Sequence, residues 1–78
     1  MPYDSKAFGV VIARLRTRRG LTQEAASALA GIARSHLAML ENGRKTVKLD
    51  TLWRIAEALG TRPSELGRLA EEEPAPKM

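Results

Sequence analysis

The sequence predicts an all-α fold, a compact bundle of five short helices. Phe8, Ile12 and Leu15 are spaced four and three residues apart, which puts them on one face of a helix. Strong helix stop signals divide the chain at intervals, and these are Gly20, Gly31, Asn42-Gly43 and Gly60. The run from Val10 to Ile12 has β propensity, but the surrounding period is helical, so we expect no strand.

The first helix is expected to run from Ser5 to Arg19. Either Asp4 or Ser5 can cap it, because short polar side chains accept hydrogen bonds from the free amides of a first turn. The second helix is expected over residues 23–30, with Thr22 as its cap. Both helices are short, so packing against neighbouring elements must supply most of their stability.

The third helix is expected from Arg34 to Glu41, after a turn at Gly31, where glycine adopts a positive φ at little cost. Leu37 and Leu40 would face inward and leave the other side of this helix outward. Together with the preceding helix, this gives two short helices joined by a tight turn. That is the pattern of a helix-turn-helix, which lays its second helix in the major groove of DNA.

Two further helices follow a basic loop. Leu49 or Asp50 opens the fourth helix, with Asp50 the better cap, and Gly60 closes it. The fifth helix starts at Pro63, because proline suits the first turn, and it runs to about Ala70.

The chain divides into one small domain over residues 1–70 and a flexible tail over 71–78, which has three adjacent glutamates and two prolines. Charge is also uneven. Residues 1–48 hold nine Lys or Arg against three Asp or Glu, a balance of +6, whereas residues 49–78 hold four against six. This asymmetry favours a surface that faces a polyanion, with a merely solvated charged surface as the alternative.

Composition excludes several classes of protein. There is no cysteine and one histidine, so neither a disulfide nor a metal site is expected. No glycine-rich phosphate loop or paired carboxylates in a pocket are evident, so we expect neither an enzyme nor a cofactor or small-molecule ligand. No apolar run approaches about 20 residues and no signal-peptide pattern is present, so we expect a cytoplasmic protein that does not enter a membrane.

The ordering of these signals closely resembles the phage-repressor type of helix-turn-helix, the Cro/cI-like or xenobiotic-response-element (XRE) family. The matching residues are Leu21-Thr22-Gln23-Glu24, Ala26, Gly31, Leu37, Leu40-Glu41-Asn42-Gly43, Leu49-Asp50-Thr51-Leu52 and Ile55-Ala56-Glu57-Ala58-Leu59-Gly60. The match covers about residues 6–70. It departs at Ala33 and Arg62, where relatives often carry a capping hydroxyl, and at Val47, where many have proline.

The resemblance implies five helices, a cytoplasmic location and homodimers on two-fold DNA sites. It also implies a partly buried ion pair between Arg16 and Glu41 that joins the first and third helices. It assigns Gln23 two tasks, reaching a phosphate and bracing the recognition helix. A simple solvated first-turn residue is the alternative for Gln23.

The outward side of the third helix supplies the candidate base contacts, which are Arg34, Ser35, Ala38 and Met39. Arginine can donate two parallel hydrogen bonds to O6 and N7 of guanine, and an apolar side chain can contact the methyl group of thymine. The alternatives are a surface role for Arg34, on a phosphate or in water, and partial core packing for Met39.

Candidate phosphate contacts surround that helix. They are Gln23, His36, Asn42, Arg44, Lys45 and Lys48. Contacts of this kind position a domain on DNA without reading its sequence. A charged loop that is only solvated is the alternative for the three cations, and His36 could also have no role.

Candidate dimer contacts are Trp53, Leu66 and Leu69. Tryptophan is over-represented at interfaces, and a short terminal helix seldom exposes two leucines without a partner. Packing of Trp53 in the core or under the fifth helix is the alternative.

These features predict a sequence-specific DNA-binding transcriptional regulator that acts as a homodimer on a two-fold operator. A repressor is favoured over an activator because blocking polymerase requires only occupancy. The chain resembles the small controller proteins of restriction-modification systems, and a phage-type repressor or a stand-alone regulator fits equally well. The alternative from another class is an antitoxin or other protein-interaction module that binds a partner protein.

Overall fold

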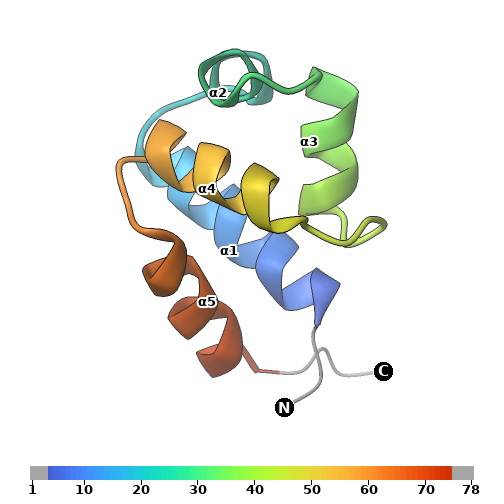
Figure 1. The fold of residues 1–78 in the computed structure, drawn as a ribbon, viewed down its shortest axis with the longest axis vertical. Helices are drawn as coiled ribbons and strands as arrows, with labels where there is room; N and C mark the ends of the chain where they lie inside the picture. The colour runs from blue at the N-terminus through green and yellow to red at the C-terminus, as the bar shows by residue number, and fades with distance from the viewer. Residues whose placement is uncertain (1–3, 75–78) are drawn as a thin grey trace.

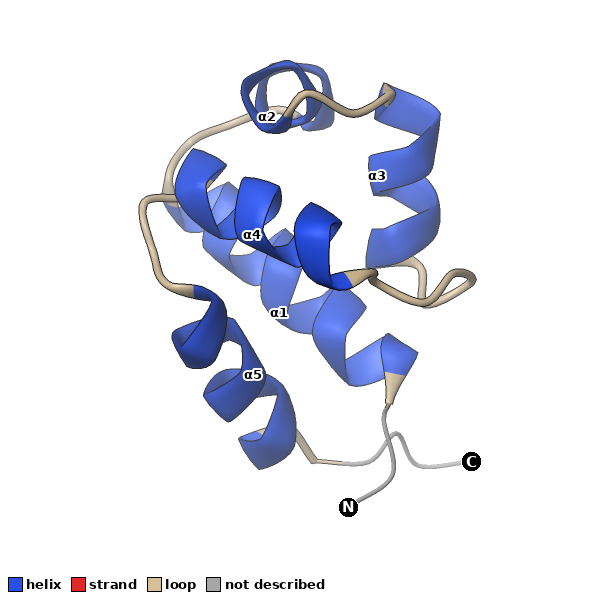
Figure 2. Cartoon of the chain, viewed as in Figure 1, coloured by secondary structure: helices blue, strands red, loops and turns tan. Residues whose placement is uncertain are grey.

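The protein has the five predicted helices in the predicted order (Figure 1). The computed structural model describes residues 4–74. Its helices are α1 Ser5–Arg18, α2 Gln23–Ala30, α3 Arg34–Glu41, α4 Leu49–Ala58 and α5 Pro63–Glu72. The all-α prediction is confirmed, since residues 4–74 contain helices and loops and no strand (Figure 2). No helix within this range combines the length and the apolar character needed to cross a membrane.

The longest helix, α1, lies in the centre of the molecule (Figure 1). It packs against α3 and α5, while α2 packs against α3 and α4. The largest fully buried side chains come from four helices and are Val11, Ile12, Leu37, Leu40, Ile55 and Leu66. A chain this short buries one small core, so every helix must contribute to it.

Local signals account for the starts of the first two helices. The Asp4 carboxylate caps α1 by accepting hydrogen bonds from the amides of Lys6 and Ala7, at 3.0 and 3.2 Å. The Thr22 hydroxyl caps α2 through the amide of Ala25, at 3.0 Å. Helix α3 begins after Ala33 without a side-chain cap, as the sequence suggests.

Three helix boundaries differ from the expectation. Helix α1 ends at Arg18, one residue early, with Arg19 as its C-cap. Asp50 does not cap α4: Lys48 holds the cap position, and Asp50 lies inside the first turn, where its carboxylate accepts from the amide of Thr51 at 2.9 Å. Helix α5 continues past Ala70 to Glu72. A physical reason is on the same helix, where Arg68 forms ion pairs with Glu65 and Glu72 and links successive turns.

That extension also draws the start of the expected tail into the body of the protein. Glu71 and Glu72 are helical, and Glu73 forms an ion pair with Arg14 of α1. The last part of the expected tail, residues 75–78, lies outside the described residues.

Helices α1 and α3 approach each other closely at Gly9. A Cβ atom added there would lie 2.5 Å from the carbonyl oxygens of both Leu40 and Glu41. These are backbone atoms at the end of α3, so a side chain at this position requires the two helices to separate. Glycine therefore sets the distance between α1 and the end of α3.

Candidate nucleic-acid interface

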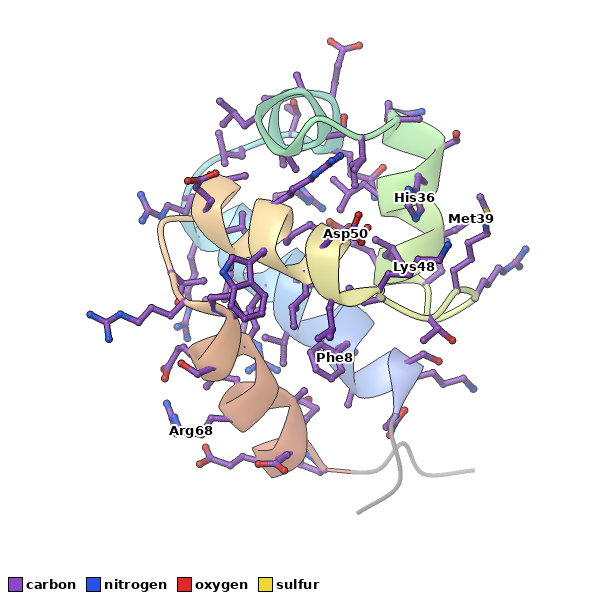
Figure 3. All side chains as sticks on the ribbon, in the orientation of Figure 1. Phe8, His36, Met39, Lys48, Asp50 and Arg68 are labelled. Atoms are coloured by element: carbon purple, nitrogen blue, oxygen red, sulfur yellow. The ribbon has the colours of Figure 1, made fainter. Side chains whose placement is uncertain are left out.

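Helix α3 presents one side to the core and one to the outside. Leu37 and Leu40 are 2% and 0% exposed and anchor the inner side. On the outer side Arg34 and Ser35 are exposed, and the rest of the candidate surface, His36, Ala38 and Met39, is partly exposed. Met39 points away from the body of the protein (Figure 3). All four candidate base contacts therefore keep some exposed surface.

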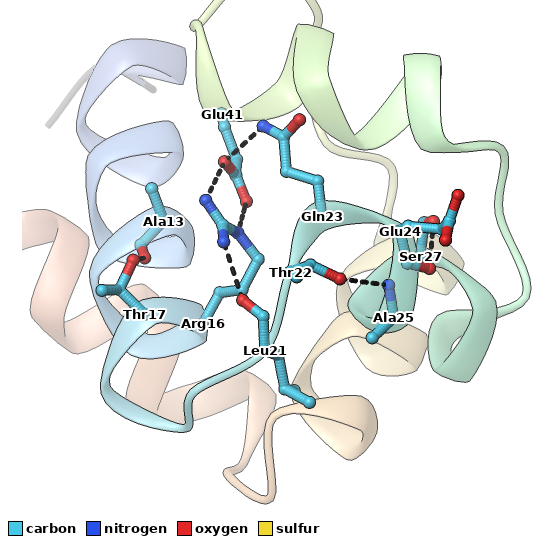
Figure 4. A network of polar contacts seen from close by, with 10 residues as sticks. All are labelled: Ala13, Arg16, Thr17, Leu21, Thr22, Gln23, Glu24, Ala25, Ser27 and Glu41. Carbon is cyan, nitrogen blue, oxygen red and sulfur yellow. Dashed lines mark hydrogen bonds and ion pairs between the residues drawn. The ribbon is translucent and has the colours of Figure 1, made fainter.

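A buried polar network fixes the end of α3 (Figure 4). Arg16 of α1 donates to both carboxylate oxygens of Glu41, from Nε to Oε2 at 2.7 Å and from Nη2 to Oε1 at 3.1 Å. Its Nη1 donates to the carbonyl oxygen of Leu21 at 2.8 Å. The side chains of Arg16 and Glu41 are 17% and 5% exposed. This is the partly buried pair that the resemblance implied.

The electrostatics of Arg16 follow from this geometry. The hydrogen bond to Glu41 raises the pKa of Arg16, and the negative charge of the same carboxylate raises it further, against the opposing effect of burial. The guanidinium therefore stays charged in its half-enclosed position.

Gln23, the first residue of α2, joins the same network. Its Nε2 donates to Glu41 Oε1 at 2.9 Å. The network thus connects α1, the start of α2 and the end of α3 at one carboxylate. This contact is the bracing interaction that the resemblance assigns to Gln23. A primary amide carries two N–H groups, so one donor of Gln23 remains for an outside acceptor such as a phosphate oxygen.

The loop that follows α3, residues 42–48, is called the basic loop below. Its candidate phosphate contacts, Asn42, Arg44, Lys45 and Lys48, are all exposed. Among the described residues, none of its three cations forms an ion pair. Their charge is therefore available to an external anion.

Two further arginines form ion pairs within the protein. Arg14 pairs with Glu73, and Arg68 pairs with Glu65 and Glu72. The hydrogen bond from Arg68 lowers the pKa of Glu65 below its ordinary value. These exposed pairs contribute to local helix order and bring little positive charge to the candidate interface.

The three predicted dimer contacts differ in how far they are buried. Trp53 on α4 is 61% exposed, so it does not pack in the core. Leu66 is 0% exposed and belongs to the monomer core, which makes the prediction of a dimer contact there wrong. Leu69 is partly buried against that core. Sequence reasoning missed Leu49, which is 73% exposed and lies four residues before Trp53, on the same side of α4.

The fold agrees with comparisons to known proteins. The model of the helix-turn-helix family matches residues 12–66. The chain belongs to the helix-turn-helix family. The resemblance to the Cro/cI-like, XRE type is confirmed with it.

Relatives of this helix-turn-helix protein are regulators. The HTH-type transcriptional regulator y4dJ of Sinorhizobium fredii is 41% identical over 69 residues, which cover 88% of this chain and 90% of y4dJ. The restriction-modification controller protein C.AhdI from Aeromonas hydrophila is 38% identical, with a TM-score of 0.79 over 81% of this chain and 96% of C.AhdI. The clp gene regulator ClgR from C. glutamicum is 25% identical, with a TM-score of 0.87 over 99% and 100% of the two chains.

Family membership determines the general function. The protein is a DNA-binding transcriptional regulator of the helix-turn-helix type, and it is not an enzyme. In a helix-turn-helix motif the second helix is the one that enters the major groove, and in this chain that helix is α3.

Proposed function

We propose that this regulator binds a two-fold DNA operator as a homodimer and represses transcription by occupying it. The observation that supports this most directly is the position of α3. Its C-terminal end is held by the Arg16–Glu41–Gln23 network, while Arg34 and Ser35 at its N-terminal end are exposed. A recognition helix must be held rigidly and remain accessible, because base contacts need both.

Within this proposal, sequence is read by the outer side of α3. Arg34 donates to guanine, Ser35 forms a single hydrogen bond to a base edge, and Ala38 and Met39 contact thymine methyl groups. Phosphates are bound on either side of α3. The proposed phosphate ligands are Gln23, His36, Asn42, Arg44, Lys45 and Lys48.

Two alanine variants separate reading from positioning. Arg34→Ala is expected to weaken binding to the operator by about 1–3 kcal/mol and to relax preference at one base pair. Lys45→Ala is expected to weaken binding to the operator and to random duplexes by the same factor, because phosphates carry no sequence information. Titrations of both variants against both duplexes measure this. If each variant lost as much affinity for the operator as for random duplexes, the assignment of base reading to Arg34 and phosphate binding to Lys45 would be contradicted.

The homodimer is proposed to form through the exposed side of α4. Trp53 and Leu49 lie one helical turn apart there, and large exposed apolar side chains that cluster are typical of interaction sites. A two-fold dimer would place two copies of α3 in successive major grooves about 34 Å apart. Leu69, which is only partly buried, stays a candidate dimer contact, whereas the fully buried Leu66 does not.

Removing the tryptophan is expected to weaken the dimer. Trp53→Ala should cost about 2 kcal/mol, roughly a 30-fold rise in the dimer dissociation constant, because buried tryptophans often dominate interfaces. Sedimentation across a micromolar concentration series measures the change. Leu29→Ala is the matched control, since Leu29 is 64% exposed but lies on α2. An effect on dimerisation from Leu29→Ala alone would move the interface to α2.

The proposal places the protein in the cytoplasm, where its DNA target lies. Repression is favoured over activation because a protein that occupies a promoter blocks polymerase by occupancy alone. A controller of a restriction-modification system is one form that such a regulator takes, and C.AhdI, 38% identical, is one.

Selection of bound fragments from random duplexes tests the proposal as a whole. We expect an enriched two-fold motif with half-sites about one helical turn apart. Affinity for that motif should fall with salt, with a log–log slope of about −0.9 for each phosphate contact. Enrichment of an asymmetric motif would refute the homodimer. No enrichment at all, with a flat salt response, would favour a module that binds a partner protein.

A further inference from the structure

The start of α1 lies against the basic loop. The Ser5 hydroxyl donates to the carbonyl oxygen of Gly43 at 3.1 Å, across 38 positions of sequence. Gly43 has a φ of 71°, which turns the chain toward Arg44. The N-terminal end of α1 and the loop after the recognition helix are therefore one packed unit (Figure 1).

Lys6 is the residue that covers this turn. A Cβ atom added at Gly43 would lie 2.7 Å from Lys6 Cγ and 2.9 Å from Lys6 Cα. The aliphatic stem of the lysine thus crosses directly over Gly43, the residue before Arg44. Lysine commonly packs its stem on a surface while its ammonium group stays in water.

The charge of Lys6 is not used within the described chain. Lys6 is exposed and forms no ion pair among residues 4–74. The neighbouring acid, Asp4, holds its carboxylate on the amides of Lys6 and Ala7 as the helix cap. Lys6 is therefore a further cation without an ion-pair partner in the described chain, and its stem packs against the turn that leads to Arg44, Lys45 and Lys48.

We propose that Lys6 is a further phosphate-binding residue, and that the phosphate-binding surface is formed jointly by the basic loop and the start of α1. The inference rests on the proposed DNA-binding role of the basic loop. Ser5 acts as a positioning residue, because its hydrogen bond to Gly43 holds the loop against α1. Lys6 would not read the DNA sequence, because it would contact only the DNA backbone.

The test compares two cations on the same helix. Lys6→Ala removes the proposed contact, and Arg18→Ala removes the same charge from the other end of α1, about 18 Å away at 1.5 Å per residue. Binding is titrated against the selected operator and a random duplex between 50 and 200 mM salt. For Lys6→Ala we expect a log–log slope on the operator shallower by about 1.8, which is about 0.9 for each protomer of the proposed dimer, and equal weakening on both duplexes. Lys6→Arg should retain the wild-type slope.

Arg18→Ala should leave the slope unchanged, since its charge lies far from the basic loop. Equal slopes for Lys6→Ala and wild type would overturn the inference, as would an equal reduction for Lys6→Ala and Arg18→Ala, which indicates only overall charge. Circular dichroism and thermal unfolding verify that each variant is folded.

Failure of the inference is distinguishable from failure of the proposed function. If the wild-type protein binds its operator with the expected salt dependence and Lys6→Ala shows the same dependence, the proposed DNA-binding function stands and Lys6 has no part in binding. If the wild-type protein itself shows no salt-dependent DNA binding, the proposed function fails first.

Discussion

Replacing Glu41 by alanine is expected to destabilise the protein by about 3 kcal/mol, the lower end of the range for breaking a buried ion pair. The carboxylate accepts two hydrogen bonds from Arg16 and one from Gln23. Its loss leaves a mostly enclosed guanidinium with only the carbonyl oxygen of Leu21. In a domain of this size the midpoint of thermal unfolding should fall by more than about 10 °C.

The matched control is Glu65→Ala. Glu65 also pairs with an arginine, but both side chains are substantially exposed, at 42% and 52%. Exposed pairs of this kind contribute about 0–1 kcal/mol, so Glu65→Ala should change stability little. Similar losses for the two variants, measured by urea unfolding, would show that the Arg16–Glu41 pair is no anchor for α3.

A double variant shows how much of the loss comes from the unpaired charge that Glu41→Ala leaves on Arg16. Arg16→Met combined with Glu41→Leu removes both charges and keeps much of the volume, so it should recover most of the stability that Glu41→Ala loses. DNA affinity should stay reduced in the double variant, because Gln23 then lacks the acceptor that orients it.

Gly9→Ala is expected to have an effect of similar size for a different reason. An alanine Cβ would lie 2.5 Å from two carbonyl oxygens and 2.8 Å from the carbonyl carbon of Glu41. Backbone atoms cannot move aside as a flexible side chain does, so α1 and α3 must separate. Overpacking of a core costs about 1–3 kcal/mol, and we expect the upper end here. Thermal unfolding measures the loss.

Helix propensity alone predicts the opposite sign. Alanine is favoured over glycine in a helix interior by about 1 kcal/mol. Gly67 on α5 gives the control, because a Cβ atom there would meet nothing within 4 Å. Gly67→Ala should therefore stabilise the protein while Gly9→Ala destabilises it. Stabilisation by both variants would mean that α1 and α3 have more freedom to separate than this packing implies.

Both substitutions act on the end of α3, which connects stability to function. Glu41 and Gly9 together set how far the end of this helix stands from α1. A helix that shifts by a fraction of its width alters which side chains reach base edges, whereas phosphate contacts from long lysines tolerate more movement. Folded preparations of either variant should therefore lose operator preference more than general DNA affinity.

Particular residues show which helix boundaries the sequence predicted correctly. Helix α2 begins and ends where its Thr22 cap and Gly31 indicated, and α3 where its apolar spacing and Asn42-Gly43 indicated, because those signals act within a few residues. Asp50 misled for the same reason, since a good capping residue two positions too late still resembles a cap. Helix α5 exceeded its expected length because Arg68 links glutamates whose spacing was visible, although the composition suggested a tail.

Some features of the candidate interface were likewise predictable from the sequence and others were not. The outward side of α3 was predictable, because burial of Leu37 and Leu40 fixes which residues lie opposite. The Arg16–Glu41 pair came only from family resemblance, since nothing local joins residues 25 positions apart. Leu49 was read as a helix start and proved to be exposed, whereas Leu66 was read as exposed and proved to be fully buried.

The sequence by itself determined the helices, their order and the helix-turn-helix motif, because capping, glycine turns and a period of 3.6 residues are local properties of the chain. Tertiary structure alone decided which leucines are buried, how near α1 comes to α3 at Gly9, and that Lys6 lies over Gly43. Those outcomes depend on the distance and angle between helices. Packing of the whole core sets both, and no single stretch of sequence contains them.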